Sequence, residues 1–432
     1  MAESSSREMY NVLLLGLCFM LVFTAFQTGS LIQKNVMSSI HEEDPSYASD
    51  GLISLSVIYA VFAVANWFAP SMVTFLSPRL SMILSAITYN VFIAQFLYPT
   101  NIGLYSASAV VGIGAAVIWT AQGTFLTQNS TMVTMSRNSG IFWAMMQLSL
   151  IWGNIFVYFE FDNEERIDKK TRNTVYGVMA IIGILGNILM IFFRKAAHII
   201  EDDKKPPFVK GIVDSFKLLT TRRMMLLSST FIYTGLELSF FSGVYSACIG
   251  FTKAFGKDSK KYVPISGIAI GVGEVASGFA FSILEKYTAK MGRAKIVGLG
   301  LVAHVGALII ALINLPFDSP FKDTTSAALI PSNIFLALFG SFLLGFGDGC
   351  FNTQVYSLIG VLHKENTAPA FGLFKFMQSV AAAAAFYYSS QLMLPYQLAI
   401  LAVFLLVGTV TFIVVARNAD SRGETFVGVS LS

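Results

Sequence analysis

The chain has 432 residues, of which 55% are hydrophobic and only 12% are charged, with a formal net charge of +4. Soluble domains carry about 25% charged residues, so this composition leaves too little polar surface for a water-soluble globule. The small positive charge does not indicate nucleic acid as a partner, and we expect the lipid bilayer to be the solvent.

Long charge-free runs follow one another in the first part of the chain. A spanning helix needs roughly 20 mostly apolar residues, and these runs are continuously apolar, which favours helices over the alternating strands of a barrel. The longest run holds two crossings, separated by a turn at Tyr98-Pro99-Thr100-Asn101. The runs cover residues 9–33, 51–78, 80–136, 138–159 and 173–193, which predicts six helices.

The second part repeats this plan and predicts six more helices, over residues 224–252, 262–284, 296–317, 331–362 and 376–416, the last run broken at Leu394-Pro395-Tyr396. The predicted fold class is an all-α membrane protein with twelve transmembrane helices in two six-helix pseudo-repeats. We expect residues 1–193 to form one bundle, residues 194–223 a cytosolic linker, and residues 224–432 a second bundle with a short tail.

Loop charges predict the orientation. With both termini in the cytosol, cytosolic segments hold 18 of the 29 Lys and Arg residues and outer loops hold 10. This bias favours cytosolic N- and C-termini. In the linker, apolar residues at helical spacing predict an amphipathic helix on the membrane surface, with a solvated connector as the alternative. These apolar residues are Val209, Ile212, Val213, Phe216 and Leu219.

The two halves carry similar motifs at similar offsets. Gly112 matches Gly345 at an offset of 233 (345 − 112), and Gln147 matches Gln378 at an offset of 231 (378 − 147). These matches predict parallel repeats. The Gly-x-Gly pair at Gly345 follows no strand, so it predicts close helix packing rather than a nucleotide loop, with a local helix break beside the next carboxylate as the alternative.

Four charged residues lie inside or directly beside the apolar runs of the second half, and we expect all four to be intramembrane: Glu237, Glu274, Asp348 and Lys375. A lone carboxylate in hydrocarbon costs at least about 2.5 kcal/mol, so these side chains are not expected to face lipid. They predict either an ion or proton site facing a central cavity, or a Lys375–acid pair that locks helices together. We expect His304 to be a packed polar residue at the bundle periphery.

Other polar and aromatic side chains in the spans are candidates for lining the cavity. The three cysteines match no metal spacing, and no nucleophile–base constellation indicates an enzyme, so we expect neither catalysis nor a cofactor. The candidate cavity-lining residues are Gln27, Trp119, Gln122, Gln147, Asn352, Gln354 and Gln378.

Several motifs together resemble the Unc-ninety-three-like branch of the major facilitator superfamily, especially its facilitator-domain-containing members. The likeness covers nearly the whole chain and implies a twelve-helix fold. The motifs that carry it are Phe23-Thr-Ala-Phe-Gln27-Thr28, Trp119-Thr-Ala-Gln-Gly123, Arg137-Asn-Ser-Gly-Ile-Phe-Trp143, Tyr233-Thr-Gly-Leu-Glu237, Gly345-Phe-Gly-Asp348-Gly-Cys-Phe-Asn-Thr-Gln354 and Phe374-Lys375-Phe-Met-Gln378.

The resemblance implies a regulatory or accessory role, through an ion channel or a membrane receptor as partner. The alternative is a proton- or ion-coupled secondary transporter of a small solute that uses the four intramembrane charges. One departure from the superfamily favours the first: the loop Phe75-Leu-Ser-Pro-Arg79-Leu80 lacks the acid of the usual Gly-x-x-x-Asp-Arg-x-Gly-Arg signature, and Gly292-Arg293 is only a remnant of it.

Overall fold

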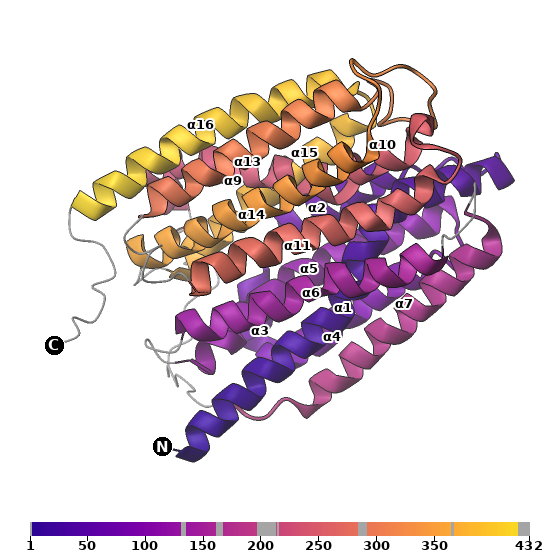
Figure 1. The fold of residues 1–432 in the computed structure, drawn as a ribbon. Coiled ribbons are helices and arrows are strands. Elements are labelled where there is room, and N and C mark those ends of the chain that lie inside the picture. The colour runs from indigo at the N-terminus through magenta and orange to yellow at the C-terminus, as the bar shows by residue number, and fades with distance from the viewer. Residues whose placement is uncertain are drawn as a thin grey trace.

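The computed structural model describes residues 2–130, 135–160, 167–196, 213, 216–283, 292–363 and 367–421, and these form helices joined by turns, with one isolated bridge between Thr252 and Thr324. The helices form two groups that lie side by side, one from each half of the chain (Figure 1). The first group comprises α1 (Ala2–Glu43), α2 (Gly51–Ala65), α3 (Ala69–Leu76), α4 (Pro78–Ala94), α5 (Asn101–Gln128), α6 (Met135–Glu160) and α7 (Lys169–Leu189), followed by the 3₁₀ turn η1 (Met190–Phe192).

The second group begins with one long helix made of α9 (Arg222–Ser239), a π-helical stretch η2 (Phe240–Tyr245) and α10 (Ser246–Phe251). Two short 3₁₀ turns lead from it to the remaining helices. The turns are η3 (Lys253–Phe255) and η4 (Ser259–Lys261), and the helices are α11 (Tyr262–Ile283), α13 (Arg293–Asn314), α14 (Ile334–Leu362), α15 (Thr367–Ser389) and α16 (Leu394–Ser421).

Within the described residues, nine helices are long and apolar enough to cross a membrane, and α2 and α4 are shorter apolar helices. The predicted class, an all-helical multi-pass membrane protein, is therefore confirmed. The total of twelve spans, the two-repeat arrangement and the cytosolic orientation of the termini stay predictions. The start of α1 and the end of α16 do lie at the same end of the bundle, as an even number of spans requires (Figure 1).

Some predicted helix boundaries agree with the structure, and others differ: α1 runs to Glu43, ten residues beyond its predicted end (43 − 33), and α15 begins at Thr367, nine residues before its predicted start (376 − 367). The turn at residues 98–101 separates α4 from α5 as expected. The break predicted at residues 394–396 comes earlier, since α16 already begins at Leu394 and places Pro395 in its first turn, where the missing N–H has no intrahelical partner to lose. The single run at residues 51–78 is divided into α2 and α3 by a turn at residues 66–68.

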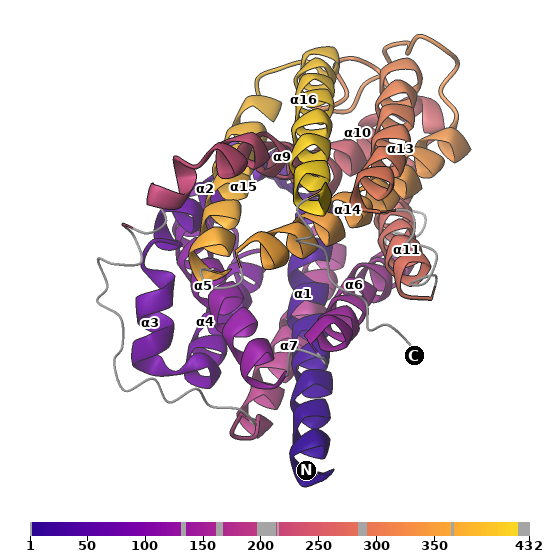
Figure 2. The ribbon, with the colours of Figure 1, turned by 90° about the vertical axis from the view of Figure 1, so that its left-hand side faces the viewer.

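The two groups meet along two helix pairs, α6 with α11 and α2 with α15. Figure 2, viewed along the bundle, shows α15 beside α2, and α11 beside α6. A hydrogen bond crosses the α2–α15 contact, where the Ser56 hydroxyl donates to the Ala383 carbonyl at 2.7 Å. The candidate site includes residues of α11 and α15, the second-group helices of these two pairs.

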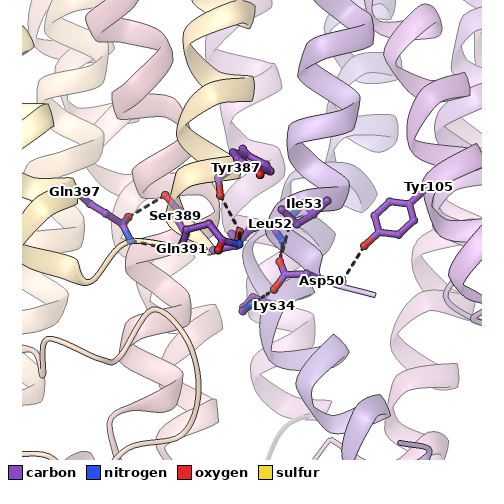
Figure 3. Close-up of polar contacts among 10 residues, drawn as sticks. Lys34, Asp50, Leu52, Ile53, Tyr105, Tyr387, Ser389, Gln391 and Gln397 are labelled. Atoms are coloured by element: carbon purple, nitrogen blue, oxygen red, sulfur yellow. Dashed lines mark hydrogen bonds and ion pairs between the residues drawn. The ribbon is translucent and has the colours of Figure 1, made fainter. Parts of the chain in front are cut away.

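The start of α2 is fixed by a charged cap. The Asp50 carboxylate accepts hydrogen bonds from the backbone N–H groups of Leu52 (2.7 Å) and Ile53 (3.2 Å), which satisfies donors that the helix leaves unpaired. Lys34 of α1 forms an ion pair with the same carboxylate (Figure 3). The tyrosine hydroxyl of Tyr105 accepts from the Asp50 N–H at 3.2 Å. This network ties α1, α2 and α5 together at one end of the bundle.

Most of the predicted amphipathic linker lies outside the described residues. Residues 213 and 216–219 are helical, as predicted, but Phe216 stacks on Trp67, with ring centroids 5.0 Å apart. Trp67 also contacts Phe376 of α15 at 5.1 Å. The described end of the linker therefore packs on the turn between α2 and α3, where the two groups meet.

Two helices in different halves begin with the same unusual backbone conformation. Ser77 precedes α4 with φ 74° and ψ 151°, and Gly292 precedes α13 with φ 77° and ψ 156°. Glycine adopts this region freely, whereas a side chain there costs about 1–3 kcal/mol. Within the described chain, Ser77 is the non-glycine residue with a positive φ. The matching turns support the predicted repeat.

We expect Ser77→Gly to stabilise the protein, because it removes this backbone strain. The apparent melting temperature of the purified protein in detergent should rise by several degrees. Ser71→Gly, in the first turn of α3, is the matched control and should not raise it, since glycine is a poorer helix former than serine and relieves no positive φ there. A lower melting temperature for Ser77→Gly would contradict the strain.

Candidate functional site

Three buried carboxyl groups meet inside the second group of helices. Glu237 of α9 is 1% exposed, Glu274 of α11 is 6% exposed and Asp348 of α14 is 7% exposed. Glu237 and Glu274 each lie close enough to Asp348 to interact with it electrostatically. Among the described residues, no N–H or O–H group donates to either Glu237 oxygen or to Glu274 Oε2. We call these three residues the carboxyl cluster.

Helix packing brings the carboxyl cluster together. A Cβ atom on Gly345 would lie 2.0 Å from the Ile270 carbonyl oxygen, so α14 can approach α11 this closely only because position 345 has no side chain. A Cβ atom on Gly347 would lie 2.2 Å from the His304 ring of α13. Close packing by the glycine pair is thus confirmed. The alternative of a local break is wrong, because α14 runs unbroken from Ile334 to Leu362.

His304 belongs to this site, and the predicted position at the bundle periphery is wrong. The residue is fully buried, with the ring of Phe351 stacked against it at 5.6 Å. Its Nδ1 atom accepts from the Tyr233 hydroxyl at 2.5 Å, and its Nε2 atom donates to the Leu344 carbonyl at 3.0 Å. The Leu344 carbonyl can only accept, so Nε2 carries a hydrogen, and a Tyr233 hydroxyl that donates to Nδ1 completes the pattern of a neutral imidazole. The Glu237 Oε1 atom, 3.5 Å from Nε2, therefore faces no formal positive charge.

Lys375 lies where the two groups meet. Its ammonium donates to Gln378 Oε1 at 2.9 Å and lies over three aromatic rings, with distances to the centroids of 4.8 Å for Phe374, 5.4 Å for Tyr356 and 6.0 Å for Trp119. Trp119 comes from α5, in the first group. Within the described chain, no carboxylate oxygen lies at ion-pair distance from Lys375, although Asp348 interacts with it electrostatically at longer range.

The other candidate residues divide into those near these charges and those away from them. Asn352 donates to Asp348 Oδ1 at 2.6 Å, and Gln378 links Lys375 to the Thr234 hydroxyl (3.2 Å). Trp119 joins the Lys375 rings. The remaining candidates do not join the site through the described contacts: Gln27 accepts from Ser149 (2.5 Å), Gln354 donates to Thr353 (3.2 Å), and Gln122 and Gln147 have no described contact with the four charges.

Charged residues outside the spans form pairs, in contrast to the carboxyl cluster. Lys253 lies 2.7 Å from Asp323, and Arg172 lies 3.4 Å from Glu43. Lys260, whose side chain is 2% exposed, reaches the same Asp323 carboxylate at 3.5 Å. Burial lowers the pKa of the Lys260 ammonium, and the Asp323 charge opposes that shift. In the described part of the chain, the three acids of the carboxyl cluster have no such ion pair with Lys or Arg.

Sequence reasoning missed His304, Tyr233 and Tyr356 as members of the site. Tyr233 precedes Glu237 by four residues, and Tyr356 follows Asn352 by four, so helical periodicity places each on the same face as its polar neighbour. That signal was available in the sequence. His304 had no such signal, because its contacts come only from the neighbouring helices α9 and α14.

Comparison with known protein families identifies the family of this chain. A family model described as "Ion channel regulatory protein UNC-93" matches residues 44–413, which is most of the chain. The chain belongs to the UNC-93 family. This confirms the resemblance seen in the sequence motifs.

Similar UNC-93 family members span the whole chain. The "UNC93-like protein MFSD11" of Xenopus tropicalis is 41% identical, covering 97% of this chain and 98% of the relative. The "Protein unc-93 homolog A" of Bos taurus is 28% identical, covering 90% and 89% respectively.

Two solved structures with a similar fold are transporters. The nucleoside transporter NupG superposes with a TM-score of 0.66 over 94% of this chain and 99% of its own, at 12% identity. A POT family transporter in complex with 5-aminolevulinic acid gives a TM-score of 0.63 over 96% of both chains, at 11% identity. This UNC-93 family chain therefore shares the fold of these two transporters, and at this identity the likeness extends to the fold alone.

Proposed function

We propose that this chain is a secondary transporter of a small solute, coupled to protons or small cations that bind at the carboxyl cluster. One observation carries the proposal: three buried acids lie together without a paired cation. If all ionised, Glu237, Glu274 and Asp348 would contribute −3, against +1 from Lys375. An uncompensated charge of −2 in an apolar interior is costly, so protons or cations must bind.

Protons fit the described geometry better than a chelated metal. Among the described residues, no group of three or more His, Cys, Asp and Glu side chains is arranged to hold a metal ion. Glu237 and Asp348 interact electrostatically, and neighbouring buried carboxyl groups favour a bound proton over two negative charges, since like charges repel. A proton also needs no opening large enough for a hydrated ion.

Loading the carboxyl cluster would change the contact between the two groups of helices. Ionised Asp348 attracts Lys375 from within the second group, while the Trp119 ring attracts the same ammonium from the first group. Neutralising Asp348 removes its attraction for the Lys375 ammonium and leaves the attraction of the Trp119 ring. The occupancy of the cluster thereby biases the position of Lys375, which is the kind of link that coupled transport requires.

Infrared spectroscopy of the protein in lipid tests whether protons occupy the carboxyl cluster. At neutral pH we expect an absorption band from protonated carboxyl groups that weakens in Glu237→Gln and in Asp348→Asn. Asp44→Asn, at an exposed loop position, is the control and should leave the band unchanged. A wild-type spectrum without this band at neutral pH would show that the carboxyl groups are ionised. Bound cations would then have to neutralise the cluster.

The family supports a second candidate function, a regulatory or accessory subunit for an ion channel or membrane receptor. Here the observation is the match of residues 44–413 to a family described as ion channel regulatory. A purely structural role for these charges would require an ion pair between Lys375 and an acid. The described structure has no direct ion pair of this kind, so the geometry favours coupled transport. The regulatory role predicts altered currents from a co-expressed potassium channel, with Glu237→Gln as effective as the wild type.

A further inference from the structure

Aromatic rings from both groups of helices surround Lys375. Trp119 stacks on Trp143 at 5.8 Å, and Trp143 meets Tyr356 edge-on at 5.6 Å. Tyr356 in turn packs edge-on against Phe374 at 5.6 Å. We call Trp119, Trp143, Tyr356 and Phe374 the aromatic ring set. The two tryptophans come from α5 and α6, and the other two residues from α14 and α15, so the ring set bridges the groups.

The exposure of these side chains differs from that of the carboxyl cluster. Lys375, Trp119, Trp143 and Tyr356 are all half-buried, although they lie where the two groups face each other. Thr353, one residue beyond Asn352 on α14, is exposed. The three acids, by contrast, are at most 7% exposed. Lys375 and the rings therefore keep part of their surface accessible, whereas the three acids are enclosed by the neighbouring helices.

The Lys375 ammonium has unused binding capacity. It carries three N–H donors, and one described hydrogen bond, to Gln378 Oε1, uses one of them. Ring faces favour the charged ammonium by about 0.5–2 kcal/mol each but accept no strong hydrogen bond. Elsewhere in the chain, buried lysines such as Lys260 and Lys34 lie against carboxylates. At Lys375 that position is open to an anion from outside the chain.

We propose that Lys375 and the aromatic ring set bind a small organic anion, a carboxylate with a flat apolar or aromatic body. Its carboxylate would accept hydrogen bonds from the Lys375 ammonium, and its body would lie against Trp119, Trp143 and Tyr356. Charge-assisted hydrogen bonds supply the specificity for an anion, and ring stacking supplies the preference for a flat body. This proposal specifies the chemical class of the ligand, which neither of the two candidate functions specifies.

Three probes of the same shape and different charge test this site: benzoate, neutral benzamide and cationic benzylamine. Two of the four tryptophans of the chain belong to the ring set, so intrinsic fluorescence of the purified full chain reports binding there. We expect saturable quenching by benzoate, with affinity at least about tenfold higher than for benzamide or benzylamine, because each of those lacks a charge-assisted bond to Lys375.

Variants locate the contact. Lys375→Arg keeps the positive charge and should bind benzoate within about threefold of the wild type, whereas Lys375→Met should lose at least about tenfold. Trp152→Phe, at an exposed position on α6 outside the ring set, is the matched control and should retain the full binding signal. If Lys375→Met does not fold, the comparison of the three probes on the wild type still decides.

Several results would overturn the anion site. Equal affinity for benzoate and benzamide would reduce the site to a stacking surface. Tighter binding of benzylamine would make it a cation cage from which Lys375 is displaced, and no saturable binding of any probe would exclude a site. Binding of benzoate does not depend on coupled transport: a chain that binds it and carries no solute would retain this site and lose only the proposed function.

Discussion

Glu237→Gln is expected to abolish gradient-driven solute flux in proteoliposomes while the protein stays folded and monodisperse. Glu237 is 1% exposed, and neither of its oxygens has a described hydrogen-bond donor, so replacing the carboxyl by an amide breaks no described hydrogen bond. Under the proposed function, the substitution removes one of the carboxyl groups that binds the coupling proton. Coupled transport needs that site to load and unload, so flux should fall to the level of empty vesicles.

Asp348→Asn should have the same effect on flux. The asparagine retains an oxygen that can accept the hydrogen bond from Asn352, so the local structure should be kept. Asp44→Asn, in an exposed loop, is the matched control and should transport as the wild type does. Normal flux in both cluster variants would show that the buried acids do not couple transport.

Thermal stability separates coupling from a structural lock. If Lys375 and an acid were locked as a pair, neutralising one partner would cost about 3–5 kcal/mol, and the double change Asp348→Asn with Lys375→Met would restore stability. The described structure has no direct pair, and Asp348 rather than Glu274 is the acid that interacts with Lys375. We therefore expect stable single variants and no rescue in the double variant.

Gly345→Val is expected to cause the largest loss of folded protein. Even a Cβ atom at this position would lie 2.0 Å from the Ile270 carbonyl oxygen, and backbone on the neighbouring helix cannot rotate away as a side chain can. The α11–α14 contact would have to separate, which would also disrupt the carboxyl cluster. Overpacking of this kind typically costs 1–3 kcal/mol or more.

Fluorescence-detected size-exclusion chromatography of a tagged protein measures this loss directly. Gly298→Ala is the matched control, because it lies in α13 where a Cβ atom would meet nothing within 4 Å. That substitution should leave the yield unchanged or raise it, since alanine is favoured over glycine in a helix by about 1 kcal/mol. A normal monodisperse peak for Gly345→Val would contradict the close contact.

The helical class and the charged residues of the site could be predicted from the sequence, because both depend on local features. Long apolar runs mark membrane spans. An acid such as Glu237 inside one of these runs can be recognised without knowing which side of the helix it occupies. Glycine spacing around Gly345 likewise predicted close packing, which the structure confirms.

Contacts between distant elements could not be predicted in the same way. His304 lies 67 positions from Glu237 (304 − 237), and only the packing of α13 against α14 places it there. The contacts of Lys375 could not be predicted either. The sequence suggested an acid as its partner, whereas in the structure its ammonium contacts Gln378 and aromatic ring faces, including Trp119 from the other half of the chain. Such contacts depend on how helices rotate about their axes, which composition does not fix.

Uptake of radiolabelled solutes and ions into proteoliposomes tests coupled transport most directly. A screen of small solutes, with an inward proton or sodium gradient imposed and then collapsed by an ionophore, should find at least one solute that accumulates only while a gradient is present. If no solute or ion enters above the level of protein-free vesicles under any gradient, or if uptake is the same after the gradient is collapsed, the coupled-transport account is wrong and the regulatory role remains.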